Sequence, residues 1–253
     1  MTTDNSLTDC LAPPPLELSQ CSAGYGSREV FSGIDLALRQ GEIFGLIGLN
    51  GVGKTTLMKS LLDLGPLRSG VIRILGQDHR LPASRQNLAY LPDRFQPTSS
   101  LRGTEFLALA RAHFSLARDD ARDEACCIAL GLEPAVLRRP IRTYSKGMGQ
   151  KLALAATFVT DRALIVLDEP MSGLDPLARV QLKRQLLASR AEGRTIFFSS
   201  HILADLEEIC DRVGVFHGGE MRFVGEPGEL LRQTGAATLE AAFLEAISPE
   251  VPA

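Results

Sequence analysis

The sequence lacks any apolar run of the roughly 18 residues needed to cross a membrane. It also lacks a basic block, and its 253 residues carry a formal net charge of −3, so nucleic-acid binding through phosphate neutralisation is not indicated. The first ten residues hold Asp4 and Asp9 but no Lys or Arg, unlike a secretory signal. We therefore expect a cytosolic protein without direct membrane insertion, which reaches any membrane through a partner.

Cysteines are few and their spacing fits no zinc site. The chain has an odd number of them, at positions 10, 21, 126, 127 and 210, and the adjacent Cys126 and Cys127 are a poor chelating unit. We interpret them as small buried hydrophobic residues in a reducing compartment. The sequence also shows no internal repeat.

The composition, 45% hydrophobic and 23% charged, suits one large α/β domain. Residues 1–15, with the run "APPP", are expected to form a flexible N-terminal tail. Short apolar runs broken by Gly predict strands and turns up to about Leu75, whereas a region of about 97–156 is rich in Ala, Leu and Arg at helical spacing. From Arg162 onward strands and helices alternate, which predicts a parallel sheet.

The most specific motif is "GLNGVGKT", which fits the phosphate loop G-x-x-x-x-G-K-[ST]. The apolar strand "EIFGLI" precedes it and a helix follows, so several backbone N–H groups and a helix N-terminus face one anion. Lys54 can reach the β- and γ-phosphates of a nucleotide, and Thr55 can hold Mg²⁺. The candidate nucleotide-binding residues here are Gly48, Leu49, Asn50, Gly51, Val52, Gly53, Lys54, Thr55 and Thr56.

Two further strands end in polar side chains. In "ALIVLDEP", Asp168 is expected to bind Mg²⁺ next to Thr55, and Glu169 to polarise a water for attack on the γ-phosphate. In "TIFFSSH", His201 follows another predicted core strand, and we expect it to contact the γ-phosphate. Tyr25, in "GYG", is either a turn aromatic or a residue that stacks on a base.

The stretch "YSKGMGQKLALA" resembles a second anion-binding loop, because Ser145 and Gly147 precede a predicted helix. With this stretch, the ordered motifs resemble those of the nucleotide-binding subunit of an ABC transporter over about residues 16–233. A short tail, "LE..F" within residues 234–253, resembles that of exporter-type subunits of the ABC-2 class. The matching positions are Tyr25 for the adenine-stacking aromatic, Gly48–Thr56 for Walker A, Ser145–Met148 for the signature, Ala163–Glu169 for Walker B with its catalytic glutamate, Ser172–Asp175 for the D-loop and His201 for the switch histidine.

This resemblance implies a P-loop NTPase core with a mostly parallel sheet, an N-terminal antiparallel β subdomain and the inserted α-helical subdomain. It implies ATP and Mg²⁺ as cofactors and a head-to-tail homodimer, in which Ser145, Lys146 and Gly147 of one chain cap the ATP of the other, with Asp175 nearby. It also implies an integral membrane permease as partner, with this chain bound peripherally at the cytoplasmic face of the inner membrane.

The sequence departs from the family pattern in two places. The signature has Lys146 where Gly is usual and Met148 where Gln is usual. After "AYLP" the family has a Gln that touches Mg²⁺, whereas this chain has Asp93, with Gln96 three residues later. Asp93 either ligates Mg²⁺ or only ends its strand.

Three alternatives within the family fit less well. Soluble translation-factor ATPases usually fuse two nucleotide domains through a charged linker, and DNA-repair ATPases carry long heptad insertions; neither feature occurs here. A regulator that does not turn over would not need Glu169 and His201. The sequence does not identify the cargo, because selectivity resides in the permease.

Overall fold

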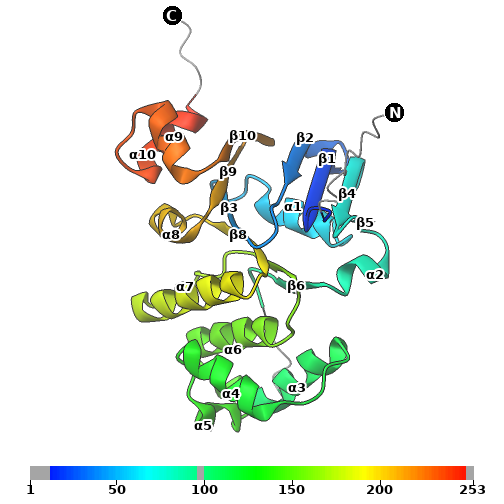
Figure 1. The fold of residues 1–253 in the computed structure, drawn as a ribbon, viewed down its shortest axis with the longest axis vertical. Helices are drawn as coiled ribbons and strands as arrows, with labels where there is room; N and C mark the ends of the chain where they lie inside the picture. The colour runs from blue at the N-terminus through cyan, green and yellow to red at the C-terminus, as the bar shows by residue number, and fades with distance from the viewer. Residues whose placement is uncertain (1–11, 96–99, 249–253) are drawn as a thin grey trace, which may run out of the picture.

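The computed structural model describes residues 12–95 and 100–248. Residues 1–11 of the expected tail, Gln96, the first residues of the helical region and residues 249–253 lie outside this part of the chain. Within it, two sheets and the helices around them build the molecule, as Figure 1 shows.

The central sheet has six strands in the order β10-β9-β3-β8-β7-β6. Strands β9, β3, β8, β7 and β6 are parallel, and β10 pairs antiparallel with β9. The runs "IFGLI" and "LIVL" are buried at every position, because a parallel sheet covered on both faces leaves no side of a strand for water. The strands are β3 (Ile43–Ile47), β6 (Leu88–Leu91), β7 (Leu164–Leu167), β8 (Thr195–Ser200), β9 (Arg212–His217) and β10 (Glu220–Gly225).

A second sheet is antiparallel, with the order β2-β1-β4-β5. Its buried side chains, such as Leu16, Leu18 and Phe31, share one apolar cluster with α1 and with Phe44 and Phe197 of the central sheet. This sheet and α1 therefore cover one face of the central sheet. The elements are β1 (Leu16–Tyr25), β2 (Arg28–Ala37), α1 (Lys54–Leu61), β4 (Leu67–Ile74), β5 (Gln77–Asp78) and α2 (Pro82–Arg85).

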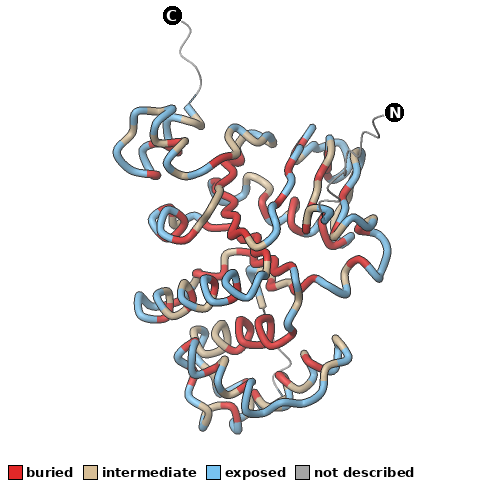
Figure 2. Tube along the Cα trace, in the orientation of Figure 1, coloured by how far each residue is buried: buried red, intermediate tan, exposed pale blue. Residues whose placement is uncertain are grey.

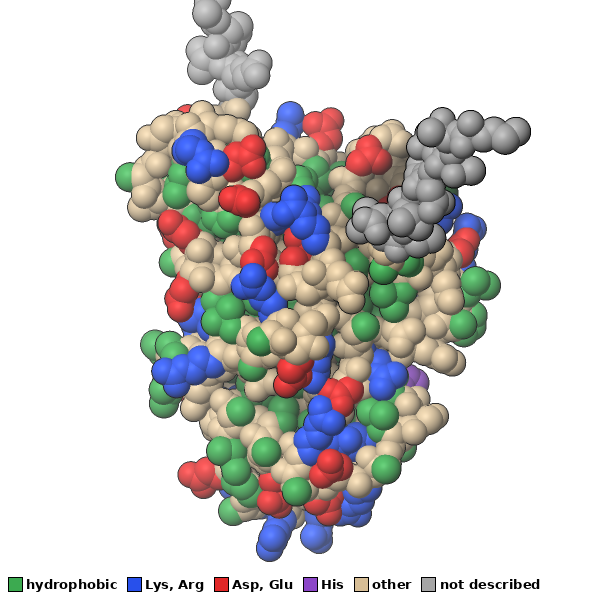
Figure 3. Space-filling view, viewed as in Figure 1, with side chains coloured by type: hydrophobic (Ala, Val, Ile, Leu, Met, Phe, Trp, Pro, Cys, Tyr) green, Lys and Arg blue, Asp and Glu red, His purple; other side chains and the backbone are tan. Residues whose placement is uncertain are grey.

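A helical insertion leaves the core after β6 and returns before β7, at the lower end of Figure 1. Its surface carries acidic and basic side chains interspersed (Figure 3). The apolar periodicity runs on through residues 104–132, but the helix stops at Phe114, where the backbone turns at Ser115 with φ of +57°. The insertion comprises α3 (Gly103–His113), α4 (Asp120–Ala129), α5 (Pro134–Leu137), a 3₁₀ turn η1 (Ile141–Thr143) and α6 (Lys146–Phe158).

The other face of the central sheet is covered by α6 and by the last four helices. Burial is concentrated in the central strands and the C-terminal half of α6 (Figure 2). Among the described residues, no helix combines the length and apolar character needed to span a bilayer. The remaining helices are α7 (Pro176–Ala191), α8 (Leu203–Ile209), α9 (Pro227–Thr234) and α10 (Leu239–Ile247). The predicted class, a mostly parallel sheet with an N-terminal antiparallel sheet, is confirmed.

Candidate functional site

The candidate residues gather at one edge of the central sheet. Neighbouring strands β3, β8, β7 and β6 end there, and they are followed by Gly48, His201, Asp168 and Asp93 respectively. Carboxyl ends of parallel strands form the usual site of ligand binding in open α/β sheets. Segments more than 100 residues apart therefore meet in space.

The phosphate loop requires its glycines for close packing. A Cβ on Gly48 would lie 2.7 Å from Phe216 O. Gly53, which precedes α1, has φ of +115°, and a Cβ there would lie 2.5 Å from Val30 Cγ1. Only glycine fits at both positions, so the chain enters α1 with its first N–H groups pointing into the loop.

Lys54 is buried with 6% of its side chain exposed, and its ammonium group bends back over the loop. Lys54 Nζ donates to Gly48 O at 2.7 Å and to Leu49 O at 3.3 Å. It also lies 3.2 Å from Glu169 Oε1. A buried charge needs such partners, and the two carbonyls hold this cation at the mouth of the loop.

Asp168 is fully buried and joins two strands to the loop. Its Oδ2 accepts a hydrogen bond of 2.7 Å from Thr55 Oγ1, and its Oδ1 accepts one of 2.7 Å from Ser199 Oγ on β8. Burial raises the pKa of Asp168, and the nearby Asp93 and Glu169 carboxylates add to the rise, while the two hydroxyl donors oppose it. A positive charge beside this carboxylate would lower the cost of ionising it.

Glu169 has a left-handed backbone with φ of +50°, which is strained for a glutamate. Its N–H donates to Ser199 Oγ at 2.9 Å, and its Oε2 lies 2.7 Å from His201 Nδ1. Its Oε1 is buried and makes no hydrogen bond within the described residues, although Lys54 Nζ lies close by. Glu169 therefore has one carboxylate oxygen that, among the described residues, pairs only with the Lys54 ammonium, and this oxygen can accept a hydrogen bond from water once the cation moves away.

Lys54, Thr55, Glu169 and His201 line what we call the phosphate-loop cleft, with a volume of about 480 Å³, and the buried Asp168 lies directly behind Thr55. The residues fit a nucleoside triphosphate with Mg²⁺. The loop supplies N–H donors and a lysine, and Thr55 with Asp168 supplies the hydroxyl and single carboxylate typical of Mg²⁺ held mainly by phosphates and water. In the described ranges, no three or more His, Cys, Asp or Glu side chains are arranged so that they alone could hold a metal ion. The lining residues are Leu49, Asn50, Gly51, Gly53, Lys54, Thr55, Thr56, Asp93, Arg94, Glu169, Ser172 and His201.

Ser145 lies in a different hollow, the Ser145 cleft, with a volume of about 830 Å³. Ser145 Oγ caps α6 by accepting from Met148 N at 3.2 Å. Lys146 lies against Gly173, since a Cβ there would be 3.6 Å from Lys146 Nζ. The two clefts adjoin and share Asp93, Arg94 and Ser172.

The remaining candidates lie apart from both clefts' linings. Tyr25 ends β1 with 53% of its surface exposed, and it lines neither cleft. Asp175 caps α7, because its Oδ1 accepts from Ala178 N at 2.9 Å. Gly147 lies in the first turn of α6. Within one chain the structure therefore brings together the Walker-type residues but neither Tyr25 nor the Ser145 loop.

Two residues in or directly behind the clefts are not identified by sequence reasoning. Ser199 connects Asp168 with the backbone of Glu169, and its only signal is a polar residue inside an apolar strand. Arg94, which lines both clefts, carries no motif.

A family model described as "ABC transporter" matches residues 31–172. An uncharacterized ABC transporter ATP-binding protein of Synechocystis sp. is 39% identical over 78% of this chain, and the chain spans 57% of that relative. Nod factor export ATP-binding protein I of Sinorhizobium fredii is 31% identical over 94% of this chain and 70% of the relative. A solved structure titled "Structure of ATP binding subunit of ABC transporter" has a TM-score of 0.83 and 32% identity, covering 91% of this chain and 98% of its own.

Proposed function

Because the chain belongs to the ABC transporter family, we propose that it binds and hydrolyses ATP as the nucleotide-binding subunit of an exporter. The observation that carries the proposal is the contact of Lys54, Thr55, Asp168, Glu169 and His201 around one cleft, supplied by the loop and by the ends of strands β7 and β8. Each of these side chains has a role in phosphate chemistry.

The loop N–H groups and Lys54 bind the β- and γ-phosphates, and Lys54 moves from the two loop carbonyls to do so. Thr55 and Asp168 hold Mg²⁺, which when bound neutralises charge on the phosphate oxygens. Asp93 is exposed in the same cleft, and we propose that it ligates Mg²⁺ as well.

Glu169 Oε1 accepts a hydrogen bond from the attacking water and draws away its proton. His201 orients the Glu169 carboxylate through Oε2 and contacts the γ-phosphate. Ser199 fixes both acids, because its hydroxyl donates to Asp168 and accepts from the Glu169 N–H.

The second half of each site comes from another copy of the chain. Ser145, with Lys146, Gly147 and the N-terminus of the 13-residue helix α6, forms a candidate anion site that does not line the chain's own phosphate-loop cleft. In a head-to-tail dimer, each Ser145 loop caps the ATP held by the partner's phosphate loop, with Tyr25 stacking on adenine and Asp175 near the interface. ATP then holds the dimer together, and hydrolysis weakens it.

We propose that this dimer drives a separate integral membrane permease of the ABC-2 class from the cytoplasmic face of the inner membrane. The proposed domain comprises residues 16–233, with the helical subdomain at about 97–156 and an extension at 234–253. The likeness to a Nod factor export protein supports export. Sedimentation with the membranes of the source cells would separate this function from that of a soluble family member.

The decisive experiment is the Glu169→Gln variant. The amide keeps the shape but does not draw away a proton, so we expect hydrolysis to fall by about 100-fold or more. ATP binding stays near the parent value, and ATP traps a dimer visible by gel filtration. Glu207→Gln, an exposed glutamate of α8, serves as the control and changes neither. Unchanged turnover and a monomer in ATP would refute the assignment.

A further inference from the structure

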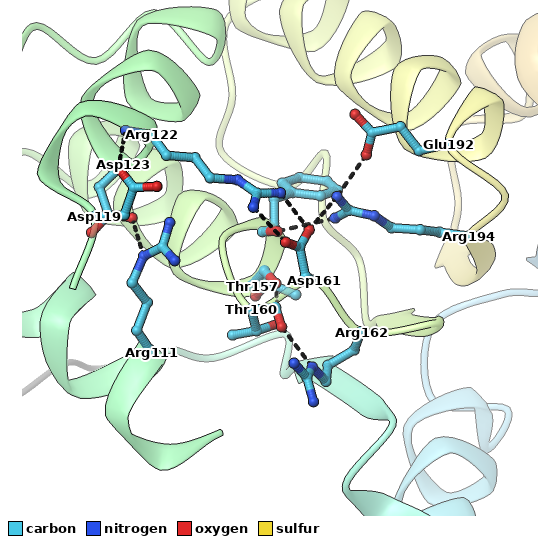
Figure 4. A network of polar contacts seen from close by, with 11 residues as sticks. Arg111, Asp119, Arg122, Asp123, Thr157, Thr160, Asp161, Arg162, Glu192 and Arg194 are labelled. Carbon is cyan, nitrogen blue, oxygen red and sulfur yellow. Dashed lines mark hydrogen bonds and ion pairs between the residues drawn. The ribbon is translucent and has the colours of Figure 1, made fainter. Parts of the chain in front are cut away.

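The carboxylate of Asp161 lies where the chain returns from the helical insertion to the core, between α6 and β7. Two arginines meet it, as Figure 4 shows. Arg122 of α4 makes a two-pronged contact, Nη1 to Oδ2 and Nη2 to Oδ1, each 2.6 Å. Arg194, from the core just before β8, contacts Oδ1 at 2.5 Å. One carboxylate therefore ties the insertion to the core; we call the three residues the Asp161 junction.

Arg194 also holds the C-terminal end of α6. Its Nη1 donates to Phe158 O at 3.0 Å, and only 11% of its side chain is exposed. The last carbonyls of a helix lack intrahelical donors, and a guanidinium there opposes the negative end of the helix dipole. The same side chain thus fixes the end of α6 and the Asp161 carboxylate.

The next residue adds a parallel tie between the two parts. The Arg162 guanidinium lies 4.9 Å from the centre of the Phe114 ring, next to the end of α3. Its Nη1 donates to Gln86 O at 3.1 Å, just before β6. By contrast, the buried pair Arg111–Asp123 joins α3 to α4 inside the insertion and does not reach the core.

Helix α6 acts as a rod between this anchor and Ser145. Its 13 residues span about 20 Å, so a tilt of about 10° at the anchored end shifts Ser145 by about 3 Å. Such a shift is as long as a hydrogen bond, and contacts made by Ser145 would be lost. On the core side, Arg194 precedes β8, which carries Ser199 and leads to His201.

We propose that Asp161, Arg122 and Arg194 are positioning residues that fix the angle between the insertion and the core, and thereby place the Ser145 loop against the partner chain's ATP. This inference rests on the proposed function, because Ser145 needs placement only if it serves a second nucleotide. The ion pairs are partly exposed, with 32% of the Asp161 and 47% of the Arg122 side chain accessible. Such pairs add little stability, so the junction orients more than it stabilises.

The test uses Asp161→Asn and Arg122→Gln in the full chain. Asparagine tolerates the left-handed backbone of Asp161, with φ of +55°, so the variant removes the charge and leaves the turn. Each variant should lower kcat about five- to twentyfold, while ATP affinity of the monomer stays within about twofold. The double variant should lose no more than Asp161→Asn alone, because that variant already removes the carboxylate with which Arg122 pairs.

The matched control is Asp120→Asn, an exposed aspartate of α4 that pairs with Arg118 inside the insertion. It should hydrolyse ATP at the parent rate. If Asp161→Asn and Arg122→Gln match this control while Ser145→Asp is inactive, the junction has no positioning role and the proposed function stands. If Ser145→Asp retains full hydrolysis, the proposed function itself fails. A loss of monomer ATP binding in Arg122→Gln would reveal a merely structural role.

Discussion

The phosphate-loop cleft and the Ser145 cleft of one chain differ in how their polar groups are held. In the first, Thr55, Asp168, Ser199 and Glu169 contact one another across two strands and a loop. In the second, the Ser145 hydroxyl accepts only from the N–H of its own helix among the described residues. The first site is therefore arranged by side chains that contact one another, whereas the position of Ser145 depends on the orientation of α6, whose Gln150 Nε2 donates to Pro170 O at 3.2 Å.

The largest expected effect is a loss of ATP hydrolysis when a negative charge is placed at position 145, which tests whether the two clefts serve different nucleotides. Asp and Asn both cap helices well, so Ser145→Asp and Ser145→Asn preserve α6 and differ in charge alone. Facing the partner's γ-phosphate, Asp should lower dimer hydrolysis about 100-fold or more, and Asn much less. ATP binding by the monomer, measured by titration, should stay unchanged in both.

Mixing two inactive variants tests further whether the two clefts of one ATP site come from different chains. Ser145→Asp chains combined with Lys54→Ala chains form one composite site that holds neither defect, so partial hydrolysis returns if the sites act independently. Loss of monomer ATP binding in Ser145→Asp would instead mean that the loop serves its own chain, and the head-to-tail dimer would be excluded.

A second substitution weakens ATP binding in the phosphate-loop cleft and leaves the Ser145 cleft unchanged. Lys54→Ala removes the cation that pairs with phosphate, and a charged hydrogen bond of about 1.5–3 kcal/mol corresponds to roughly 10- to 100-fold weaker ATP binding. The control is Lys59→Ala, an exposed lysine on the same helix, which should bind ATP as the parent does. Equal affinities of the two variants would contradict the phosphate-loop assignment.

How far the sequence predicts these clefts depends on how locally each is encoded. The phosphate loop is contiguous, and parallel topology alone brings Asp168 and His201 to its edge. Ser199 is 31 residues from Asp168, and the sequence "FFSSH" contains no pattern that predicts their contact. The left-handed backbone of Glu169, the helix break at Phe114 and the meeting of Arg122 with Arg194 arise from tertiary packing, which a motif does not contain.

A smaller effect concerns Asp93, at the boundary of the two clefts. If this carboxylate ligates Mg²⁺, Asp93→Asn should raise the Mg²⁺ concentration for half-maximal hydrolysis about tenfold, the lower range for losing a partner of a metal site. Turnover at saturating Mg²⁺ should fall less. Asp120→Asn is again the control, and an Mg²⁺ dependence equal to the control's would mean that Asp93 only ends its strand.

The smallest expected effect is on thermal stability. Here the substitution, Asp168→Asn, should be favourable, whereas the substitutions above lower ATP binding or hydrolysis. Burial raises the pKa of Asp168, so the folded chain holds this proton more tightly than the unfolded chain does. Stability from this group is present below its ordinary pKa and is lost as the pH rises through the folded value. At pH 7.5, without nucleotide or Mg²⁺, Asp168→Asn should therefore raise Tm by about 2–4 °C, corresponding to about 1 kcal/mol in a domain of this size. The asparagine still meets Thr55 and Ser199, whose hydroxyls both donate and accept.

The difference in Tm between Asp168→Asn and the parent should shrink as the pH falls toward 5, because Asp168 of the parent then takes up a proton. With saturating ATP and Mg²⁺ the parent should have the higher Tm of the two chains, because only the parent keeps the carboxylate that binds Mg²⁺ and is stabilised fully by the ligand. Thermal unfolding of both chains at the two pH values checks this prediction. A lower Tm of the variant at pH 7.5 would show that the ionised Asp168 carboxylate does not destabilise the folded chain.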